Sequence, residues 1–522
     1  MQVGGTPVKA VVATGLFLAA LLAARPAWAE TLLRARLNAD IVSTMPGMRR
    51  DENTDAVLIH IVEGLVASRE DGSVGPMLAK GWTVSPDGRV YTFALRDGVS
   101  FHNGAKLTAE DVLWSFHWYL EPKNHWRCLS ALEGTIAKIV SVTAPDRMTV
   151  RIALDRPAPL FLKTLSRADC GGTGILQRAS VAVNGVTWTR PIGTGPFMLG
   201  DWRHGNYLEL LRFPHYAARP GPGDGNAGGK HALVDRVRFL IIPDSSAAAA
   251  ALMRGNLDLM DALDPNQLGI VRRDSAIRLV GAPVLDFYAL LFQTQDPVLK
   301  DPRMRRAIAL TIDRAGLAHA ATNGTALADS SPVPVASPFY GHAESEMTEP
   351  NVAQARLLAA ASGYKGQPII LTTNRRYPEM FDSAVLVQAM AARAGINLQI
   401  QIVDWATQVS LYSGGKYQAM SFAFSAKMDP SFNFDLLIGD KRKDARKVWD
   451  SEASRALYKE TVQTADPSAR QAAFDRLNAA FLADTPAIVL FNSQRISGVR
   501  ANVRGYKPWP AAQQRLWNVE IR

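Results

Sequence analysis

The first half of the chain is patterned as short β-strands separated by turns. The run VYTFAL alternates between apolar and polar positions up to Leu95, and the SPDG turn at Ser85–Gly88 precedes it, so this region predicts a β-hairpin that starts at Trp82. Further elements are predicted as strands at about 135–143 and 148–154, a short helix near 160–167, and a second hairpin over 193–213.

From about Leu285 the period changes, and amphipathic helices alternate with strands. The segment DPRMRRAIALTIDR places Met304, Ile308 and Ile312 on one helical face. The run INLQIQIV alternates from Ile396 to Ile402, which predicts a strand with one apolar face. Further elements are a helix that ends at Gly395, a helix from about Ala406, helices at about 449–463 and 467–484, and the strands QAMSFAFS and AIVLF. This alternation predicts an α/β fold.

The stretch LRDGVSFHNGAKLTAEDV mixes glycines, acids and a histidine, and it raises the question of a catalytic loop. DG and NG are turn dipeptides, and Thr108 with Asp111 three residues later forms an acidic capping box for a helix that runs to about Leu120. His102 has no second His or Cys at ligand spacing. The local pattern therefore predicts strand, turn and capped helix, a scaffold role.

The first 29 residues predict a cleaved secretory signal peptide. Lys9 precedes the uncharged run AVVATGLFLAALLAA, which is too short to span a bilayer comfortably. Ala27 and Ala29 then supply the small residues that a signal peptidase reads. A membrane anchor is the alternative interpretation of this segment. No cysteine lies near the cut, so we expect an exported, periplasmic protein that is not a lipoprotein.

Export places the two cysteines, Cys128 and Cys170, in an oxidising compartment. A bond between them would stabilise the fold by about 3–4 kcal/mol in the chain-entropy model. Their number and the compartment favour a disulfide over the alternative of two separate buried thiols.

Charge and motifs give little indication of chemistry. The chain has 58 Lys and Arg against 48 Asp and Glu, but basic clusters such as Lys441–Lys447 are short and broken by acids, which indicates solvated faces and no nucleic-acid site. No GxSxG, HExxH, CxxC or Walker pattern occurs, and the GxGxxG at Gly223–Gly228 lacks the strand and helix that a dinucleotide site needs. The acidic group Asp51, Glu52 and Asp55 is interpreted as a solvated helix start. We expect no catalytic residue, metal or cofactor.

Several long motifs in order carry a family resemblance. The region from IVEGLVASREDGSVGPMLAKGW through LTAEDVLWSF, with PIGTGPFML, LLRFPHY, DPRMRRAIALTIDR and ARLLAAASGY after it, resembles the family 5 solute-binding proteins of peptide/nickel-type ABC importers. The match covers essentially the whole chain after the signal peptide. It implies a two-lobed periplasmic-binding-protein clam, type II-like, in which the ligand is buried in the cleft by closure.

The resemblance also implies a division of the chain, with an extra subdomain inserted in lobe I. The expected parts are a signal peptide at 1–29, lobe I at 30–70, the inserted subdomain at 71–184, lobe I again at 185–284, lobe II at 285–488 and the C-terminal part of lobe I at 489–522.

The dipeptide-binding branch of the family implies an Arg for the peptide carboxylate and an Asp for its α-ammonium, because both charged ends lose water in the cleft. NRRYPE resembles the Arg-containing stretch and places Arg375 there; the alternative is a solvated loop residue. FSAKMDPSFNF resembles the stretch with the Asp, but Ala426 stands at its position. Asp429 is a possible substitute, although its place before Pro430 suggests a structural role.

Five further residues are candidates for the ligand site. Trp405 and Tyr288 are expected as cleft aromatics, with core packing as the alternative for both. Phe424 and Ser425, together with Ala426, could offer backbone groups to an extended ligand. Arg50 lies in a loop aligned with a ligand-contacting segment, with a solvated role as the alternative.

We therefore expect the substrate-binding component of an ABC importer, a monomer without catalytic activity that delivers a peptide or peptide-like solute to membrane permease subunits. A second hypothesis is a receptor for a non-peptide solute, such as an opine-like conjugate or another small organic acid, on the same scaffold. An exported hydrolase, and a sensor or chaperone-like protein on this scaffold, are hypotheses from two different classes.

Overall fold

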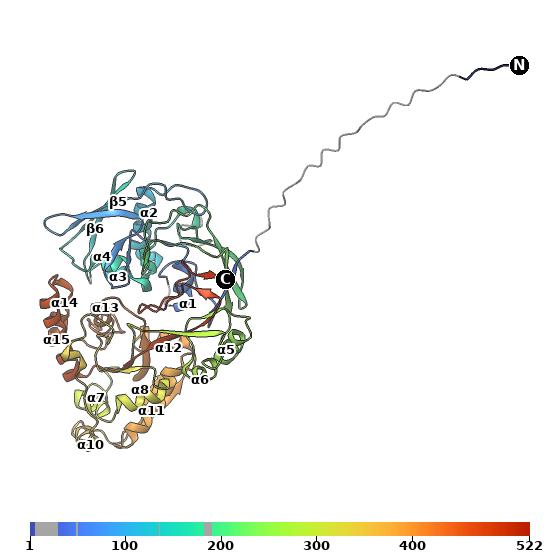
Figure 1. Ribbon diagram of the computed structural model, residues 1–522. Coiled ribbons are helices and arrows are strands. Elements are labelled where there is room, and N and C mark those ends of the chain that lie inside the picture. The colour runs from blue at the N-terminus through green and yellow to red at the C-terminus, as the bar shows by residue number, and fades with distance from the viewer. Residues whose placement is uncertain (6–29, 49–50, 135, 182–189) are drawn as a thin grey trace.

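The computed structural model describes residues 1–5, 30–48, 51–134, 136–181 and 190–522 and forms two lobes (Figure 1). The cleavage region of the expected signal peptide lies outside the described residues. No helix in the described part of the chain is long and apolar enough to cross a membrane.

The first lobe is built on a seven-stranded sheet whose strands come from distant parts of the chain. Their order across the sheet is β14 (Ile277–Pro283), β21 (Gln494–Arg500), β13 (Leu259–Met260), β1 (Leu32–Leu37), β12 (Arg236–Ile241), β9 (Tyr207–Arg212) and β8 (Phe197–Arg203). Strand β1 is parallel to β12 and β13, and the other pairs are antiparallel. The predicted second hairpin is therefore confirmed as β8–β9 at the edge of this sheet.

The second lobe is built on a six-stranded sheet from a mostly continuous part of the chain. The order is β16 (Leu327–Ala328), β20 (Ala487–Asn492), β15 (Phe287–Phe292), β19 (Ala419–Phe424), β17 (Ile369–Thr373) and β18 (Leu398–Ile402). Helices α8 (Arg314–Thr322) and α11 (Pro378–Ala392) pack on it. The mixture of helices and sheets confirms the predicted α/β class.

Two adjacent crossovers connect the lobes. Strand β14 of the first sheet leads into β15 of the second, and β20 of the second leads back into β21 of the first. The two crossovers are hydrogen-bonded to each other, because Val284 N–H donates to the Ser493 carbonyl at 3.0 Å and Ser493 N–H donates to the Asp286 carboxylate at 2.9 Å. The chain thus returns at Ser493, whereas the expected boundary at 488/489 falls inside β20.

A third, four-stranded sheet belongs to the inserted region, in the upper part of Figure 1. Its order is β4 (Ala79–Val84), β5 (Val90–Leu95), β7 (Thr149–Leu154) and β6 (Ile139–Asp146). The predicted hairpin is confirmed as β4–β5. Helix α2 (Ala109–Leu120) begins with the predicted capping box, in which Thr108 N–H and Oγ1 both donate to the Asp111 carboxylate.

His102 shows why the stretch before α2 is a scaffold. Its Nδ1 accepts from Gly193 N–H at 3.2 Å, and its Nε2 contacts the Gly195 carbonyl at 3.0 Å, so the ring joins two distant motifs. Burial lowers the pKa of His102 to about 4, which keeps the ring neutral and able to accept at Nδ1.

The remaining helices and short strands complete the description. The helices are α1 (Glu52–Leu58), α3 (Leu129–Leu132), α4 (Phe161–Leu165), α5 (Ser245–Met253), α6 (Leu268–Val271), α7 (Pro302–Ala309), α9 (His342–Ser345), α10 (Val352–Ala361), α12 (Trp405–Ser413), α13 (Ser431–Leu437), α14 (Glu452–Gln463) and α15 (Pro467–Asp484). The two-stranded pairs are β2 (Val66–Ser68) with β3 (Val74–Pro76), β10 (Gly223–Asp224) with β11 (Ala227–Gly228), and β22 (Val503–Arg504) with β23 (Glu520–Ile521).

Two details of the predicted periodicity are wrong. Helix α7 ends at Ala309, so Ile312 is buried beyond the helix rather than on its face. Strand β18 is the edge strand of its sheet, and its Ile402 is 47% exposed although Leu398 is buried. An edge strand has fewer neighbours to cover its apolar side chains.

The disulfide between Cys128 and Cys170 is present, with the two Cα atoms 5.9 Å apart, as the sequence predicts. It fixes the short helical segment 168–173, which carries Asp169, to the start of α3. Asp169 is one of the residues that line the space between the lobes.

Candidate functional site: the interlobe cleft

A cleft of about 450 Å³ lies between the two lobes. Its walls come from helix α1, from the loops after β12 and β13, from the loop before α11, from the end of β19, and from the C-terminal segment around residues 511–514. Both crossovers also contribute to it, through Asp286 and Ser493. The volume is within the range of small-molecule binding sites.

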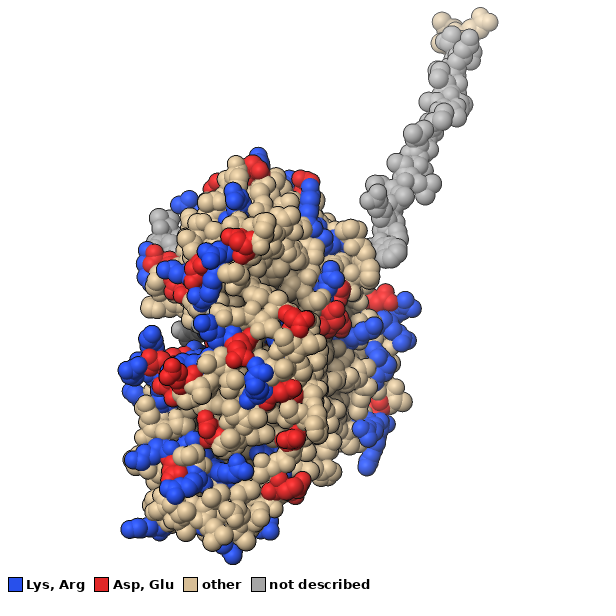
Figure 2. All heavy atoms as spheres, turned by 90° about the vertical axis from the view of Figure 1, so that its left-hand side faces the viewer, with Lys and Arg blue, Asp and Glu red and all other residues tan. Residues whose placement is uncertain are grey.

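Acidic residues outnumber basic ones in the cleft, although the chain as a whole has a formal net charge of +10. The lining acids are Asp51, Glu52, Asp55, Asp169, Asp244, Asp261, Asp264, Asp286 and Glu379, and the lining bases are Arg36, Arg375, Arg376 and Arg495. On the outer face that Figure 2 shows, in contrast, the two signs are interspersed. The cleft therefore favours positively charged groups of a ligand.

Burial makes ionisation of several cleft acids unfavourable. Burial, with Asp264 and Asp286 nearby, raises the pKa of Glu379 to about 7. Burial also raises the pKa of Asp286, although Ser493 donates to its carboxylate. For Asp55 the pKa is raised well above its ordinary value by burial and by the neighbouring Asp169 and Asp51. The described residues thus place too little positive charge beside these carboxylates to offset their burial.

Arg375 lies in the cleft wall on the loop between β17 and α11. It is exposed, its guanidinium lies 4.7 Å from the centre of the Phe381 ring, and it forms no ion pair with any other described residue. A guanidinium in this state can offer two parallel N–H donors to a carboxylate.

The neighbouring Arg376 is already engaged. Its Nη2 lies 3.7 Å from the Asp51 carboxylate across the cleft. Asp51 is the N-cap of α1 and accepts from Thr54 N–H at 3.0 Å. The acidic group at 51–55 therefore does begin a helix, but the interpretation of a solvated start is wrong for Asp51, which is only 6% exposed and lines the cleft.

The predicted aromatics are both packed and in contact with the cleft. Trp405, the first residue of α12, lines the cleft while it stacks on Phe422 at 5.7 Å and meets Tyr377 edge-on at 4.9 Å. Tyr288 lines the cleft and stacks on Phe491 at 4.6 Å. Each ring is therefore held in place by a packed neighbour while part of it borders the cavity.

The end of β19 contributes less side-chain surface than the sequence suggests. Phe424 lines the cleft but is only 2% exposed, because its ring stacks on Phe287 at 4.8 Å. The carbonyl and hydroxyl of Ser425 accept from Lys427 Nζ at 3.0 and 2.8 Å. Backbone pairing of this segment with a ligand stays a prediction.

Ala426 lines the cleft and is 9% exposed, packed with Val284 and Leu285. Asp429, the possible substitute, is completely buried and is not among the lining residues. Position 426 thus offers a methyl group where the resemblance implies a carboxylate.

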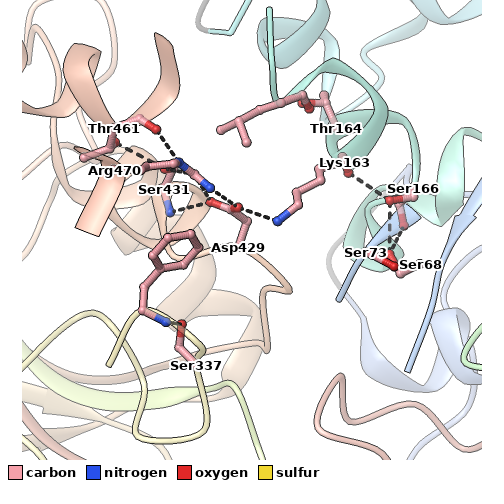
Figure 3. Close-up of polar contacts among 12 residues, drawn as sticks. Ser68, Ser73, Lys163, Thr164, Ser166, Ser337, Asp429, Ser431, Thr461 and Arg470 are labelled. Atoms are coloured by element: carbon pink, nitrogen blue, oxygen red, sulfur yellow. Dashed lines mark hydrogen bonds and ion pairs between the residues drawn. The ribbon is translucent and has the colours of Figure 1, made fainter. Parts of the chain in front are cut away.

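Asp429 instead joins the two lobes, as Figure 3 shows. Its carboxylate accepts from Lys163 Nζ of the first lobe at 2.9 Å and from both terminal nitrogens of Arg470 of the second lobe at 2.8 and 2.5 Å (Figure 3). Although burial alone would raise it, these two cations hold the pKa of Asp429 at about 2. The suggested structural role of Asp429 agrees with this geometry.

A second ion pair crosses the same seam. Lys427 Nζ lies 3.2 Å from the Asp169 carboxylate, and Arg167, which is also bound to Asp169, places its guanidinium 4.7 Å from the centre of the Phe432 ring. Together with Lys163–Asp429, these contacts connect the two lobes across the seam.

Arg50, the remaining candidate, lies outside the described residues. Within the described ranges, no group of three or more His, Cys, Asp or Glu side chains could hold a metal ion.

Sequence reasoning did not identify several polar cleft residues. Asp286 lies on a crossover, Glu379 is in the first turn of α11, and Gln513 with Gln514 lies in the C-terminal segment. Their only signal in the sequence is one polar residue, or a short polar run such as Gln513–Arg515, beside an apolar element, which is common on any surface. Asp55 belongs to a visible acidic group, but its position in the cleft depends on the second lobe.

Two lobes with two adjacent crossovers, a cleft between them and ion pairs across the seam define a class of protein, the binding proteins that close around a solute. The family model for bacterial extracellular solute-binding proteins, family 5 (middle region), matches residues 73–444. The chain belongs to this family.

Known relatives extend over most of the chain. It is 28% identical over 453 residues to the probable di/tripeptide-binding protein 5 of Pseudomonas aeruginosa, covering 81% of this chain and 82% of the relative. It is 25% identical to the dipeptide-binding protein of Escherichia coli, with 97% of both chains covered.

Solved structures show the same fold. The periplasmic binding protein DppA of Helicobacter pylori in complex with the peptide STSA has a TM-score of 0.84 at 24% identity, covering 94% of this chain and 98% of that one. AgaA of A. tumefaciens R10 in complex with agropinic acid has a TM-score of 0.83 at 23% identity, covering 94% and 99%. These similarities confirm the predicted two-lobed clam.

Proposed function

We propose that this protein is the periplasmic receptor of an ABC importer and that it delivers a short peptide to the membrane permease. The observation that carries the proposal is the cleft between the lobes, in which the guanidinium of Arg375 forms no ion pair with another described residue. A ligand carboxylate supplies the charge that this guanidinium lacks. The relatives at 25–28% identity are named as peptide-binding proteins, which supports peptides over an opine-like solute.

The receptor acts by closure without a chemical step. The crossovers at 284–286 and 493 form the hinge, and the pairs Lys163–Asp429 and Lys427–Asp169 form when the lobes meet. A ligand bound to both walls shifts the population toward this closed form, which the permease recognises. The inserted subdomain at 71–184 moves with the first lobe.

The proposal includes a cleaved signal peptide at 1–29, no lipid anchor, and a monomer that does not bind nucleic acid. On the face in Figure 2 the charges of the two signs are interspersed, so that face has no continuous basic surface of the kind that a nucleic-acid site needs. Within the cleft, Arg375 binds the carboxylate, while Trp405 and Tyr288 contact the peptide side chains.

Calorimetric titration of the mature protein with di- and tripeptides tests the proposal. We expect saturable binding to the wild type and a loss of roughly tenfold to hundredfold in Arg375→Ala, since a hydrogen-bonded charge is lost. Lys365→Ala, which removes an exposed charge outside the cleft, is the matched control and should bind like the wild type. Absence of peptide binding to the wild type would overturn the proposal.

A further inference from the structure

Asp169 is an acid of the first lobe whose carboxylate also binds the second lobe. It accepts from Arg167 Nε at 3.1 Å and from Arg167 Nη2 at 2.9 Å, and Arg127 Nη2 lies 3.9 Å away. These two cations belong to the first lobe. A third cation, Lys427, comes from the second lobe, and its Nζ lies 3.2 Å from the same carboxylate. The Asp169–Lys427 pair therefore joins the lobes at this point.

This ion pair is buried and charged. The side chains of Asp169 and Lys427 are 8% and 3% exposed. Although burial alone would raise it, Arg167, Lys427 and Arg127 hold the pKa of Asp169 well below its ordinary value, so its carboxylate is ionised. A buried ammonium that loses its carboxylate is strongly destabilised and moves toward water. Displacement of Asp169 should therefore expose Lys427.

The disulfide lies directly beside the ion pair. Asp169 immediately precedes Cys170, and Arg127 immediately precedes Cys128. The bond spans 42 residues and brings the two Cα atoms to 5.9 Å, so it places two first-lobe segments against each other. One of them carries the carboxylate that Lys427 binds, and the bond is therefore a covalent anchor for that carboxylate.

The backbone that carries Asp169 is irregular. The last three residues of the short helical segment 168–173 all have positive φ, and one of them, Thr173 at 44°, is β-branched. Such a residue is costly in the left-handed region, so the surrounding structure has to hold the segment in this form. Arg167 is no external anchor, because it directly precedes the segment and would move with it. The bond to α3 is an anchor from outside the segment.

Lys427 is held in place from the second lobe and from the hinge. Its backbone N–H donates to the Leu285 carbonyl of the first crossover at 3.2 Å, and its Nζ donates to the Ser425 carbonyl at 3.0 Å. These contacts do not involve the segment 168–173. The position of Asp169 therefore decides whether the ion pair between the lobes forms.

We propose that the disulfide between Cys128 and Cys170 sets Asp169 in the position that Lys427 binds, so that the lobes close completely only in the oxidised protein. The bond forms by thiol–disulfide exchange, in which one cysteine thiolate attacks an external disulfide and the second cysteine displaces the mixed disulfide. Two electrons and two protons pass from the cysteines to the oxidant, which leaves as two thiols. A dithiol reductant reverses the reaction and becomes a disulfide itself.

Closure thus depends on the compartment in which the chain folds. Both cysteines are buried, so the bond is protected once it has formed. A chain whose cysteines are still reduced lacks the anchor of Asp169 and closes less tightly. It still retains the Lys163–Asp429 pair, because Lys163 lies on α4, outside the segment that the disulfide fixes.

Chemical labelling of lysines tests the proposal without a ligand. The ligand-free wild type, Asp169→Asn and a variant with both cysteines replaced by alanine are treated with acetic anhydride. Mass spectrometry of proteolytic fragments gives the labelling rate of each lysine, and circular dichroism checks the fold. Lys427 reports on the ion pair. Lys230 is the matched control, because it is buried inside the first lobe and its Nζ lies 3.5 Å from Glu63.

We expect Lys427 to react at least roughly tenfold faster in both variants than in the wild type, since its ammonium loses the buried carboxylate. Lys230 should stay protected in all three proteins. Small-angle scattering should give both variants a larger radius of gyration than the wild type.

A kinetic experiment replaces the double alanine variant if that variant does not fold. The wild type is labelled in short pulses after addition of dithiothreitol, and loss of the disulfide is followed in the same samples. Lys427 should become reactive as the bond is cut and before Lys230 does.

Three results would overturn the proposal. Protection of Lys427 in either variant would show that the bond, or the Asp169 carboxylate, does not hold this contact. An unchanged radius of gyration in both variants would show that the contact does not contribute to closure. If Lys427 and Lys230 become reactive together, the bond only stabilises the fold of the first lobe. None of these results bears on peptide binding, which the calorimetric titration tests separately.

Discussion

Asp429 and Asp55 are two acids of the interlobe region in opposite electrostatic situations. Asp429 is fully buried between the lobes and receives hydrogen bonds from Lys163 and Arg470, which hold its pKa at about 2. Asp55 lines the cavity, none of the described residues donates a hydrogen bond or an ion pair to its carboxylate, and its pKa is raised. The contrast separates a seam, where charges are matched within the protein, from the proposed binding site, where we expect a ligand to supply the matching charge.

The largest effect is expected from breaking the matched seam. Asp429→Asn leaves Lys163 and the buried Arg470 without their counterion, so the free energy of unfolding should fall by about 3–5 kcal/mol. Urea denaturation measures this loss. Asp440→Asn removes the ion-pair partner of the exposed Arg442 and should leave the stability close to that of the wild type. A loss below about 1 kcal/mol in Asp429→Asn would show that the seam is not stabilised by this carboxylate.

Removal of the disulfide tests how much the bond between Cys128 and Cys170 stabilises the segment 168–173, which carries Asp169 in the cleft wall. Replacement of Cys128 and Cys170 by alanine should lower the free energy of unfolding by about 3–4 kcal/mol, because the unfolded chain is no longer constrained. Thermal and urea unfolding measure it, and the wild type treated with reductant is the control in which the same bond is broken. If neither the alanine replacement nor the reductant alters unfolding, the disulfide between Cys128 and Cys170 does not stabilise the protein.

Cleft acids whose pKa is raised by burial should make the free energy of unfolding depend on pH. Glu379 has a folded pKa of about 7, above the ordinary value of 4.5, so the folded protein binds more protons between these values. Stability from this group is therefore present at low pH and is lost as the pH rises toward 7.

Glu379→Gln should flatten this dependence and raise the free energy of unfolding at pH 8 by about 1–3 kcal/mol. Urea titrations at a series of pH values measure it. If the free energy of unfolding depends on pH in the same way for the variant and the wild type, burial in the cleft does not disfavour the ionised form of Glu379.

The smallest effect is expected from Lys163, whose side chain is partly exposed at the seam. Lys163→Gln leaves Arg470 on Asp429, so closure should weaken by only about 1 kcal/mol. Small-angle scattering of the ligand-free protein should show a larger radius of gyration than the wild type. Arg203→Gln, which breaks an exposed pair within one lobe, should leave the radius unchanged. If Lys163→Gln leaves the radius of gyration unchanged, the Lys163–Asp429 ion pair does not contribute to closure of the lobes.

Local patterns predicted the scaffold well. The turn before VYTFAL, the Thr108–Asp111 capping box and the two cysteines depend on residues near in sequence or on their number alone, and the structure contains all of them. The helix end at Ala309 and the exposure of Ile402 could not be predicted in this way, because they depend on tertiary packing and on the place of a strand at a sheet edge.

The candidate site could be predicted only where a motif marks it. Arg375, Trp405 and Tyr288 line the cleft as expected, but their contacts with a ligand stay predictions. Asp55 and Gln514 are separated by most of the chain, and only folding brings α1 and the C-terminal segment to the same cavity. A local pattern of apolar and polar residues contains no information on such a long-range contact.

The most direct test is the mass of the protein purified from a native periplasm, recorded intact and after denaturation. We expect a difference that corresponds to the masses of short peptides. A single mass that corresponds to a non-peptide solute would contradict the view that the cleft binds a short peptide.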